Sequence, residues 1–503
     1  MAIKRYFASK DNTISNAFTN NLTDRGTDGN MGASDILEAF VIHGQTNATI
    51  DDTPSANNAT NAEQTRFLVE FPISAITSDM ADGTLPADTG SIKFYLNLFN
   101  APHGDSTPLG YDLDVFMLSE TWSEGTGLDM DNYTDLGSSN WVSSSAGVLW
   151  TQAGGTYLSG VGTQKTAAFD TGLENLSVDV SDQVYKWLDS TDNNGFLIKL
   201  PDSVVSGSEA LYTKKFFSRT SEFFHYRPVL EARWDSARKD SRGNFFISSS
   251  IAPAADNINT LYLYNVIRGQ LKNIPGLDGN TLSMEIRSGS SAPVGSALQI
   301  EDIGGTSVSS VVAGLLQENG TTVTGVYTAS FSSTSSYDTT FDVWHTTSLG
   351  GEKIEFYTGS YQPKAVNTTD NLNGEEYITS ITNLEDSYTQ GQKPQIRVFP
   401  RKKNWNPNIY TVASSEVSPE IIEDSYYQVH RTIDGMTIIP YGTGSSNNNF
   451  TKMSYDVSGN YFDLDTSYLE SGYAYGITFA YYLQDEYKEQ PEVFKFRIKE
   501  EDK

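Results

Sequence analysis

Two carboxylates flank a tryptophan in the first half of the chain. Glu120 and Glu124 stand on either side of Trp122. Paired carboxylates that face each other across a cleft can hydrolyse a glycosidic bond. No feature of the sequence places these two across a cleft, and acidic residues are abundant throughout the chain. We therefore interpret them as ordinary acidic groups and expect that the protein is not an enzyme.

Three tryptophans are the candidates for glycan binding: Trp122, Trp141 and Trp150. They lie between expected strands in a region rich in Gly and Ser. An exposed aromatic face stacks on a sugar ring, while nearby amides bind the hydroxyl groups. The alternative is that these side chains pack inside the protein, because large aromatic residues usually serve cores first.

The sequence offers little that would bind a metal ion. Residues 129–135 hold three aspartates, and hard oxygen ligands suit calcium. The spacing departs from the EF-hand loop, so we interpret the segment as a solvated acidic loop. The chain has no cysteine, which excludes disulfides and Cys-ligated metals, and no two of its five histidines lie within ten residues of each other. We expect no metal and no cofactor.

One basic run stands out in an acidic chain. Arg397, Arg401, Lys402 and Lys403 surround Pro400 and precede Trp405. Together with Trp405, these four cations could dock on an acidic patch of a neighbouring subunit and orient the contact. The alternative is a solvated hairpin tip.

The overall charge limits the class of partner. The 503 residues include 34 Lys and Arg against 63 Asp and Glu, a net charge of −29. That balance argues against nucleic acid and against an anionic membrane surface as partners. Asp11 and Asn12 interrupt the start before an apolar run can form, so we expect no signal peptide. Aromatic residues make up 12% of the chain, which indicates a folded protein rather than an acidic disordered one.

Short runs with alternating apolar residues dominate the pattern and predict β-strands. Clear examples are 65–71, 92–99, 111–118, 196–200, 261–267 and 395–399. One helix is predicted over 180–188, with Ser181 as its cap and with Val184, Trp187 and Leu188 on one face. The segment 34–40 fits either a helix that begins at Ser34 or a strand. Many short strands with few helices predict an all-β, multidomain chain of antiparallel sandwiches.

Polar segments divide the chain into three expected domains. Residues 1–236 form the first, and the basic stretch 236–243 then looks like a linker. Residues 244–365 and 366–503 form two further strand-rich domains, which we expect to be Ig-like β-sandwiches. A polar stretch at 367–374 marks the second, less sharp boundary.

The first domain resembles the DNRLRE-type β-sandwich, which is similar to carbohydrate-binding jelly rolls. The likeness covers about the first 235 residues and rests on the order of several short pieces, although the hexapeptide that names the family is absent. These pieces are 10–17, 31–37, 66–71 followed by Pro72 and Ile73, 91–96, 118–124, 176–181 leading to Trp187, 194–200 and 226–232. The resemblance implies a jelly-roll-like sandwich.

The whole chain also resembles virion structural proteins of tailed phages, especially marine myoviruses, through segments 1–8, 25–35 and 473–483. This implies a structural component of the virion, as a capsid decoration, neck or tail accessory protein. Such a protein would act by assembly with other virion proteins, be a homo-oligomer or present in many copies, and be located in the particle. The alternative is a carbohydrate-binding adhesin or receptor-binding fibre subunit, whose partner would be a host glycan.

Overall fold

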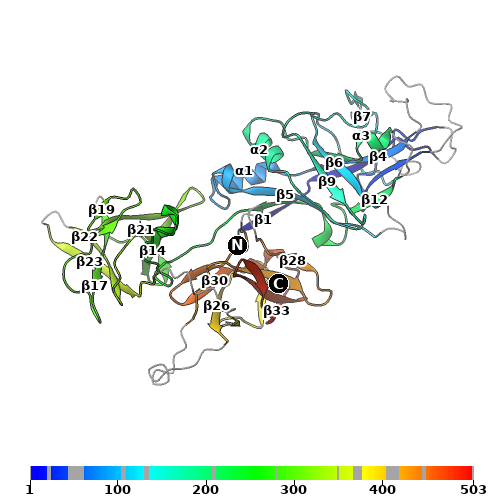
Figure 1. The fold of residues 1–503 in the computed structure, drawn as a ribbon. Helices are drawn as coiled ribbons and strands as arrows, with labels where there is room; N and C mark the ends of the chain where they lie inside the picture. The colour runs from blue at the N-terminus through cyan, green and yellow to red at the C-terminus, as the bar shows by residue number, and fades with distance from the viewer. Residues whose placement is uncertain are drawn as a thin grey trace. The chain divides into compact units, whose positions relative to one another are not determined.

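The structure is a computed structural model that describes residues 2–19, 24–43, 62–102, 109–129, 135–206, 211–277, 281–347, 351–365, 376–403, 419–443 and 449–500. The chain is built from β-sheets with a few short helices (Figure 1). The prediction of an all-β chain made of several β-sandwich modules is confirmed. The chain divides into two compact units, Ile3–Trp234 and a second one that comprises Met1–Ala2 and Asp235–Lys503.

Two antiparallel sheets form the first unit. The smaller has the order β1 (Ile3–Phe7), β13 (Val229–Arg233), β5 (Lys93–Leu98) and β10 (Leu176–Asp179). The larger has the order β12 (Leu211–Phe217), β3 (Ile36–Ile42), β4 (Glu63–Glu70), β11 (Phe196–Lys199), β6 (Tyr111–Met117) and β9 (Gln164–Phe169), and β2 (Lys10–Ser15) pairs with β4. The hairpin of β7 (Ser143–Ser145) and β8 (Val148–Leu149) forms a third, small sheet. Both large sheets contribute fully buried apolar residues, among them Phe67 and Val115 from one and Phe94 and Leu230 from the other.

Helices of this unit are short: α1 (Ile73–Ala81), α2 (Ser181–Asp189), α3 (Asp202–Val205), and the 3₁₀-helices η1 (Thr89–Ser91) and η2 (Phe224–Tyr226). The predicted helix over 180–188 is α2, which lies beside α1 (Figure 1). The capping prediction is wrong, because the Ser181 hydroxyl bonds to Asp179 and accepts the Phe94 N–H instead. The segment 34–40, which left two possibilities open, falls largely in strand β3.

The second unit begins with one curved antiparallel sheet that encloses its own core. Its order is β14 (Asn259–Tyr264), β21 (Thr321–Phe331), β20 (Val311–Glu318), β17 (Leu282–Ser288), β22 (Thr340–Thr347) and β23 (Lys353–Tyr361). Smaller elements are η3 (Ala254–Asn257) and the pairs β15 (Val266–Ile267) with β16 (Gln270–Leu271) and β18 (Ile300–Glu301) with β19 (Ser307–Val308). Trp344, Met284, Leu261 and Phe331 are fully buried and pack in one cluster.

The later part of the second unit is a sandwich of two sheets. One has the order β24 (Tyr377–Ile381), β26 (Gln395–Lys402), β30 (Gly459–Asp463) and β29 (Ser454–Asp456). The other has the order β25 (Ser387–Thr389), β33 (Phe494–Lys499), β31 (Ala474–Leu483), β27 (Ser425–Arg431) and β28 (Thr437–Ile439), with β32 (Glu486–Glu489) on β31, and η4 (Thr466–Tyr468) precedes β31. The division at residues 365 and 366 stays a prediction.

The stretch that we expected to be a linker is packed into the second unit. The Arg242 guanidinium is buried, and it contacts Asp342 at 2.7 Å and Asp240 at 2.9 Å. The Trp344 indole N–H donates to the same Asp342 carboxylate at 2.7 Å. Burial raises the pKa of Asp240 to about 6, although Arg242 opposes the shift. This segment therefore contributes ionic contacts to the core, which its polar sequence did not indicate.

Candidate functional site

Four linked aromatic rings of the first unit remain partly exposed. Phe217 ends β12, Phe99 follows β5, and Phe223 and Tyr226 lie in and next to η2. The Phe217 ring stacks on Tyr226 with centroids 5.1 Å apart, and it lies 5.6 Å from Phe223, while Phe99 lies 5.9 Å from Tyr226. Phe223 is 50% exposed and the other three are half-buried. These four residues are called the aromatic patch below.

Strand geometry sets the direction in which the patch faces. The Phe217 N–H donates to the Phe99 carbonyl at 3.0 Å, so the chain after β5 runs along β12. Because alternate residues of a strand share a face, Lys215 lies on the same face as Phe217, while Lys214 and Phe216 point into the core. Lys215 pairs with Glu38 of β3 at 3.7 Å, so the cation beside the patch already has an acidic partner within the chain.

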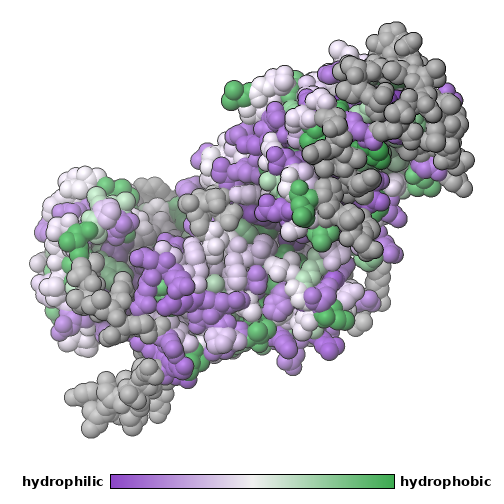
Figure 2. All heavy atoms as spheres, turned by 45° about the vertical axis from the view of Figure 1, so that its right-hand side comes forward, coloured by the Kyte–Doolittle hydropathy of each residue, from purple (hydrophilic) through white to green (hydrophobic). Residues whose placement is uncertain are grey.

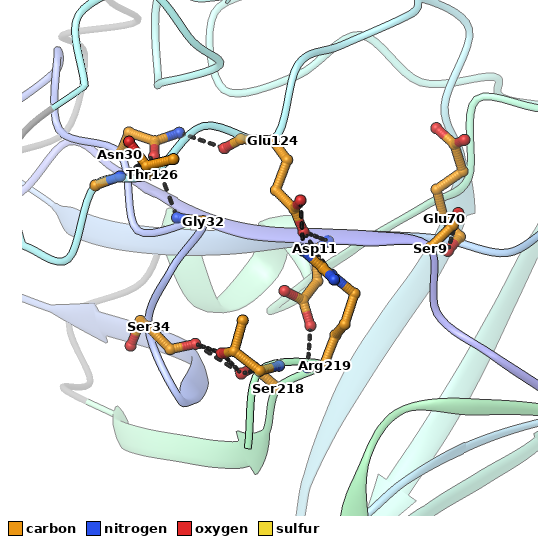
Figure 3. A network of polar contacts seen from close by, with 12 residues as sticks. Ser9, Asp11, Asn30, Gly32, Ser34, Glu70, Glu124, Thr126, Ser218 and Arg219 are labelled. Atoms are coloured by element: carbon orange, nitrogen blue, oxygen red, sulfur yellow. Dashed lines mark hydrogen bonds and ion pairs between the residues drawn. The ribbon is translucent and has the colours of Figure 1, made fainter. Parts of the chain in front are cut away.

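Hydrogen bonds hold the loop that joins the two halves of the patch (Figure 3). The Ser218 N–H donates to the Asp35 carbonyl at 3.0 Å, and its hydroxyl donates to the Ser34 carbonyl at 2.6 Å. The Thr220 hydroxyl donates to the same Ser34 carbonyl at 2.9 Å. These bonds hold the loop in one conformation, so the positions of Phe217 and Phe223 relative to each other are fixed.

Arg219, in the same loop, joins two carboxylates of the first unit. Its backbone N–H donates to Asp11 Oδ2 at 2.6 Å, and its guanidinium donates to both carboxylate oxygens of Glu124 at 2.8 and 2.7 Å. Glu124 also accepts the Asp11 N–H at 2.8 Å. The two-pronged geometry is the strong form of an arginine–carboxylate pair. Figure 3 shows the Arg219 side chain extending to the Glu124 carboxylate, with the Asp11 carboxylate beside it.

A buried asparagine anchors the Glu124 segment. Asn30 donates from its side chain to the carbonyls of Glu124 at 2.7 Å and Ser139 at 2.8 Å, and it accepts the N–H groups of Gly127 and Gly32. A Cβ at Gly32 would stand 2.3 Å from the Glu124 carbonyl oxygen, so the close approach requires glycine there. The segment that carries Glu124 is therefore fixed against the loop before β3.

Asp11 is the residue of this network whose ionised form is destabilised by its surroundings. Burial raises its pKa to about 7, and nearby Glu124 adds to the effect, while the bond from Arg219 opposes it. Its Oδ1 atom is buried without a hydrogen-bond partner. An ionised carboxylate in that position is costly, so Asp11 gains a proton well above the pH at which an exposed aspartate would.

The two glutamates that could have formed a hydrolytic pair are used separately. Glu124 forms the ion pair with Arg219, whereas Glu120 accepts the Thr151 N–H at 3.3 Å. The expectation that the protein is not an enzyme stays a prediction.

The three candidate tryptophans lie in a second, small core on the outer face of the larger sheet. Trp122, Trp141 and Trp150 are each about 5% exposed or less and cluster with Leu68 and Leu197 under the connection between β6 and β9. The Trp122 and Trp150 indoles donate to the carbonyls of Asn194 and Asn140, both at 2.9 Å. None of the three presents a ring to solvent, so the glycan-binding expectation is wrong and the core alternative holds.

Cations border this second core. Arg66 is buried, lies 4.9 Å from the Trp141 ring and donates to the Gly154 carbonyl at 2.9 Å. Lys199 lies in β11, the strand next to β4, and pairs with Asp202; in the register of β11 with β6 it lies opposite Asp114. Burial lowers the pKa of both Arg66 and Lys199, and Arg66 adds to the shift of Lys199. These cations hold the covering segment in place rather than facing a partner.

The basic run that we expected to dock on a neighbouring subunit lies mostly in a strand. Its described ion pairs are with acids of the same sandwich. Arg397, Arg401 and Lys402 belong to β26, which runs between β24 and β30, so the hairpin-tip alternative is wrong for these three. Arg397 pairs with Asp456 at 2.6 Å, and Lys403 pairs with Glu376 at 2.5 Å. Trp405 lies outside the described residues. A docking role for this run stays a prediction.

The acidic segment 129–135 is described only at its ends. Asp135 accepts the N–H groups of Thr126 and Gly137 and the hydroxyl of Ser138, which makes it a turn-forming residue. In the described part of the chain, no group of three or more His, Asp or Glu residues could hold a metal ion. The described helices are all too short or too polar to cross a membrane.

The sequence did contain a signal for the aromatic patch that we missed. Residues 216–226 hold five Phe and Tyr residues, with Arg219 among them and Arg227 directly after, in a chain that is otherwise strongly acidic. Residue type alone favoured the tryptophans, but the tryptophans are the residues that a core would bury first.

Figure 2 shows one face on which hydrophobic residues form small, separate areas among hydrophilic ones.

Comparisons with known proteins add little. No family model matches the chain, and no curated protein matches it. Fibronectin(III)-like modules of Clostridium thermocellum CbhA match 53% of this chain and 92% of their own at 11% identity, with a TM-score of 0.15. A BSP domain of a biofilm-associated protein matches 93% of this chain and 81% of its own at 10% identity, with a TM-score of 0.14. At these TM-scores neither likeness carries an argument about this chain.

Proposed function

We propose that the chain is a structural component of a tailed-phage virion, as a capsid decoration, neck or tail accessory protein that acts through protein–protein assembly. The observation that carries the proposal is the aromatic patch, whose rings are held half-exposed by a bonded loop. Aromatic residues are enriched at the centres of protein interfaces, where their burial drives association. The resemblance of segments 1–8, 25–35 and 473–483 supplies the type of particle.

Two further features support an assembly role. The described ionic clusters bond internally: Arg219 with Glu124 fixes a loop, and Arg242 with Asp342 fixes a core. The net charge of −29 would keep free copies soluble and away from nucleic acid until they meet their binding site.

Mass spectrometry of gradient-purified particles from a phage that encodes this chain tests the proposal. We expect the chain to band with the particles at a fixed ratio to the major capsid protein. A parallel gradient of the recombinant chain without particles provides the control for accidental sedimentation. Absence of the chain from infectious particles would contradict the proposal.

The carbohydrate-binding alternative retains one possible surface, because the aromatic patch is exposed. Its geometry is poor for sugar stacking, since Phe217 and Tyr226 cover each other at 5.1 Å with nearly parallel rings. A glycan array with the isolated chain separates the two functions: an adhesin binds sugar as a free chain, and an assembly protein does not.

A further inference from the structure

We propose that the end of the β22–β23 hairpin is an acid-sensitive device, in which protonated His345 displaces Lys353 from the carboxylate of Glu285 and loosens the start of β23. The device lies in the curved sheet of the second unit and does not rest on the proposed function. It depends on side chains that meet at one carboxylate oxygen, and on a β-bulge that separates this end of the hairpin from the rest of the ladder.

Glu285 is a buried carboxylate that already has two cations. It belongs to β17, where Met284 and Ile286 on either side point into the core, so its side chain leaves from the opposite face of the sheet. Arg287 Nε donates to its Oε1 at 2.8 Å, and the Lys353 ammonium donates to its Oε2 at 2.5 Å. Burial raises the pKa of Glu285, but the bonds from Lys353 and Arg287 outweigh burial and lower that pKa overall. The carboxylate therefore stays negative in the pH range in which histidine titrates.

His345 lies beside these ion pairs without a hydrogen bond of its own. Its Nε2 atom is 3.5 Å from Glu285 Oε2, the oxygen that Lys353 also contacts, and its side chain is 6% exposed. Neither ring nitrogen has a hydrogen-bond partner among the described residues. Burial lowers the pKa of His345, and the nearby cations Lys353 and Arg287 add to the shift, which the carboxylate opposes. At neutral pH the ring is therefore uncharged, and Lys353 keeps the oxygen.

Acid changes which group pairs with that oxygen. A buried imidazolium without a partner is costly, so the protonated ring gains by moving onto Oε2. Lys353 can leave, because its side chain is 51% exposed and water solvates its ammonium. Glu355 faces His345 in the ladder but is exposed, and Asp342 of the same strand pairs with Arg242 on the core side. The Glu285 carboxylate therefore remains the partner for the charged ring.

A β-bulge makes this end of the hairpin a separate part of the ladder. The register of β22 with β23 shifts between Trp344 and His345. The shift divides the ladder into the outer pairs, 345–347 with 353–355, and the inner pairs, 340–344 with 357–361. A bulge interrupts the regular hydrogen bonds of a ladder, so the two sets can open separately. Loss of the contact between Lys353, which starts β23, and Glu285 therefore weakens the outer pairs and leaves the inner pairs closed.

Hydrogen–deuterium exchange of the full-length chain, read by mass spectrometry of peptides at about pH 7.5 and about pH 5, tests the proposal. Exchange times are scaled for the intrinsic pH dependence of amide exchange. Opening frees His345, so the open form binds a proton at the ordinary pKa of 6.5, whereas the closed form does so only at lower pH. We therefore expect exchange of the outer pairs to accelerate as the pH falls below 6.5, by up to about 10-fold per pH unit, while the inner pairs keep their protection.

Substitutions separate the two partners of the exchange. His345→Gln should remove the response, because it leaves no group to protonate; if that variant unfolds, His345→Leu replaces it, since neither ring nitrogen has a bond to lose. Lys353→Met should weaken the response, because the imidazolium then displaces no cation, although its outer pairs exchange faster at both pH values. Lys353→Arg keeps the cation and should keep the response. His430→Gln, at a half-buried histidine of β27 in the same unit, is the matched control and should respond as the unchanged chain does.

Four results would overturn the proposal. The first is protection of the outer pairs that does not change with pH, and the second is acceleration of the inner pairs to the same extent, which would mean that the whole sheet unfolds in acid. The third is a response that the His345 variants retain. The fourth is an undiminished response in Lys353→Met, which would show that protonation acts without displacing Lys353.

Discussion

Replacing Asp11 by asparagine should remove a pH dependence from the stability of the first unit. Burial raises the pKa of Asp11 to about 7 in the folded chain, against an ordinary value of 3.8. The folded state therefore binds a proton more readily than the unfolded state between these values, so stability is highest at low pH and falls as the pH rises towards and through 7. Integrated from about pH 5 to about pH 8, this linkage amounts to a loss of about 2.5 kcal/mol in the free energy of unfolding.

Urea unfolding of the full chain at several pH values in that range measures the effect. Tryptophan fluorescence reports mainly on the first unit, which holds five of the seven tryptophans, Trp122, Trp141, Trp150, Trp187 and Trp234. Other groups titrate too, so the informative quantity is the difference between the two pH profiles, one for the unchanged chain and one for Asp11→Asn. The asparagine side chain places N–H groups without a partner at the position of Oδ1. This changes the free energy of unfolding by the same amount at every pH, so it shifts the pH profile without changing its slope.

Asp192→Asn, an exposed aspartate of the same unit, is the control and should keep the profile of the unchanged chain. Parallel profiles for the unchanged chain and for Asp11→Asn would refute the reasoning, because they would mean that Asp11 is ionised in the folded state as easily as in the unfolded one. An opposite slope would mean that the bond from the Arg219 N–H outweighs burial.

Three further substitutions test the other buried groups, each by urea unfolding. Arg242→Met leaves Asp342 buried without its cation and should cost about 3–5 kcal/mol; a variant as stable as the unchanged chain would show that the pair contributes nothing. Lys214→Met leaves three oxygen acceptors within 2.9 Å unpaired, so we expect a loss of about 3 kcal/mol, and a gain in stability would contradict the described bonds. Trp141→Ala should cost about 3–5 kcal/mol, whereas Leu149→Ala, at an exposed position, should change stability by less than about 0.5 kcal/mol. Equal effects of these last two would show that Trp141 is not in a core.

The strands could be predicted from the sequence because their signal is local. Alternating apolar residues at 65–71, 111–118 and 196–200 identify β4, β6 and β11 within a residue or two. Helix α2 follows from the spacing of its apolar residues. Helix α1 was not predicted, because its buried face consists of Ile73 and Ile76 alone and gives no longer period.

The candidate site could not be predicted in the same way, because its members come from distant segments. Phe99 meets Tyr226 only after the chain that follows β5 has been placed beside β12, and Asp11 meets Glu124 and Arg219 across 113 and 208 residues of sequence. The sequence also did not show which large aromatic residues are buried. In the structure the tryptophans are core residues, whereas phenylalanines are exposed. A sequence pattern specifies which residues alternate, but it does not specify which large side chains the covering segment between β6 and β9 will hide.

Asp11 takes part in fixing the loop of the aromatic patch although its burial destabilises the first unit. A buried carboxylate with a raised pKa destabilises the first unit near neutral pH, so a fold optimised for stability alone would place an apolar or amide side chain there. Asp11 nevertheless accepts the Arg219 N–H, and Arg219 pairs with Glu124, so the carboxylate takes part in fixing the loop between Phe217 and Phe223. The Asp11 carboxylate thus contributes one accepted hydrogen bond to this loop, and because its charge is buried that contribution comes with a loss of stability near neutral pH.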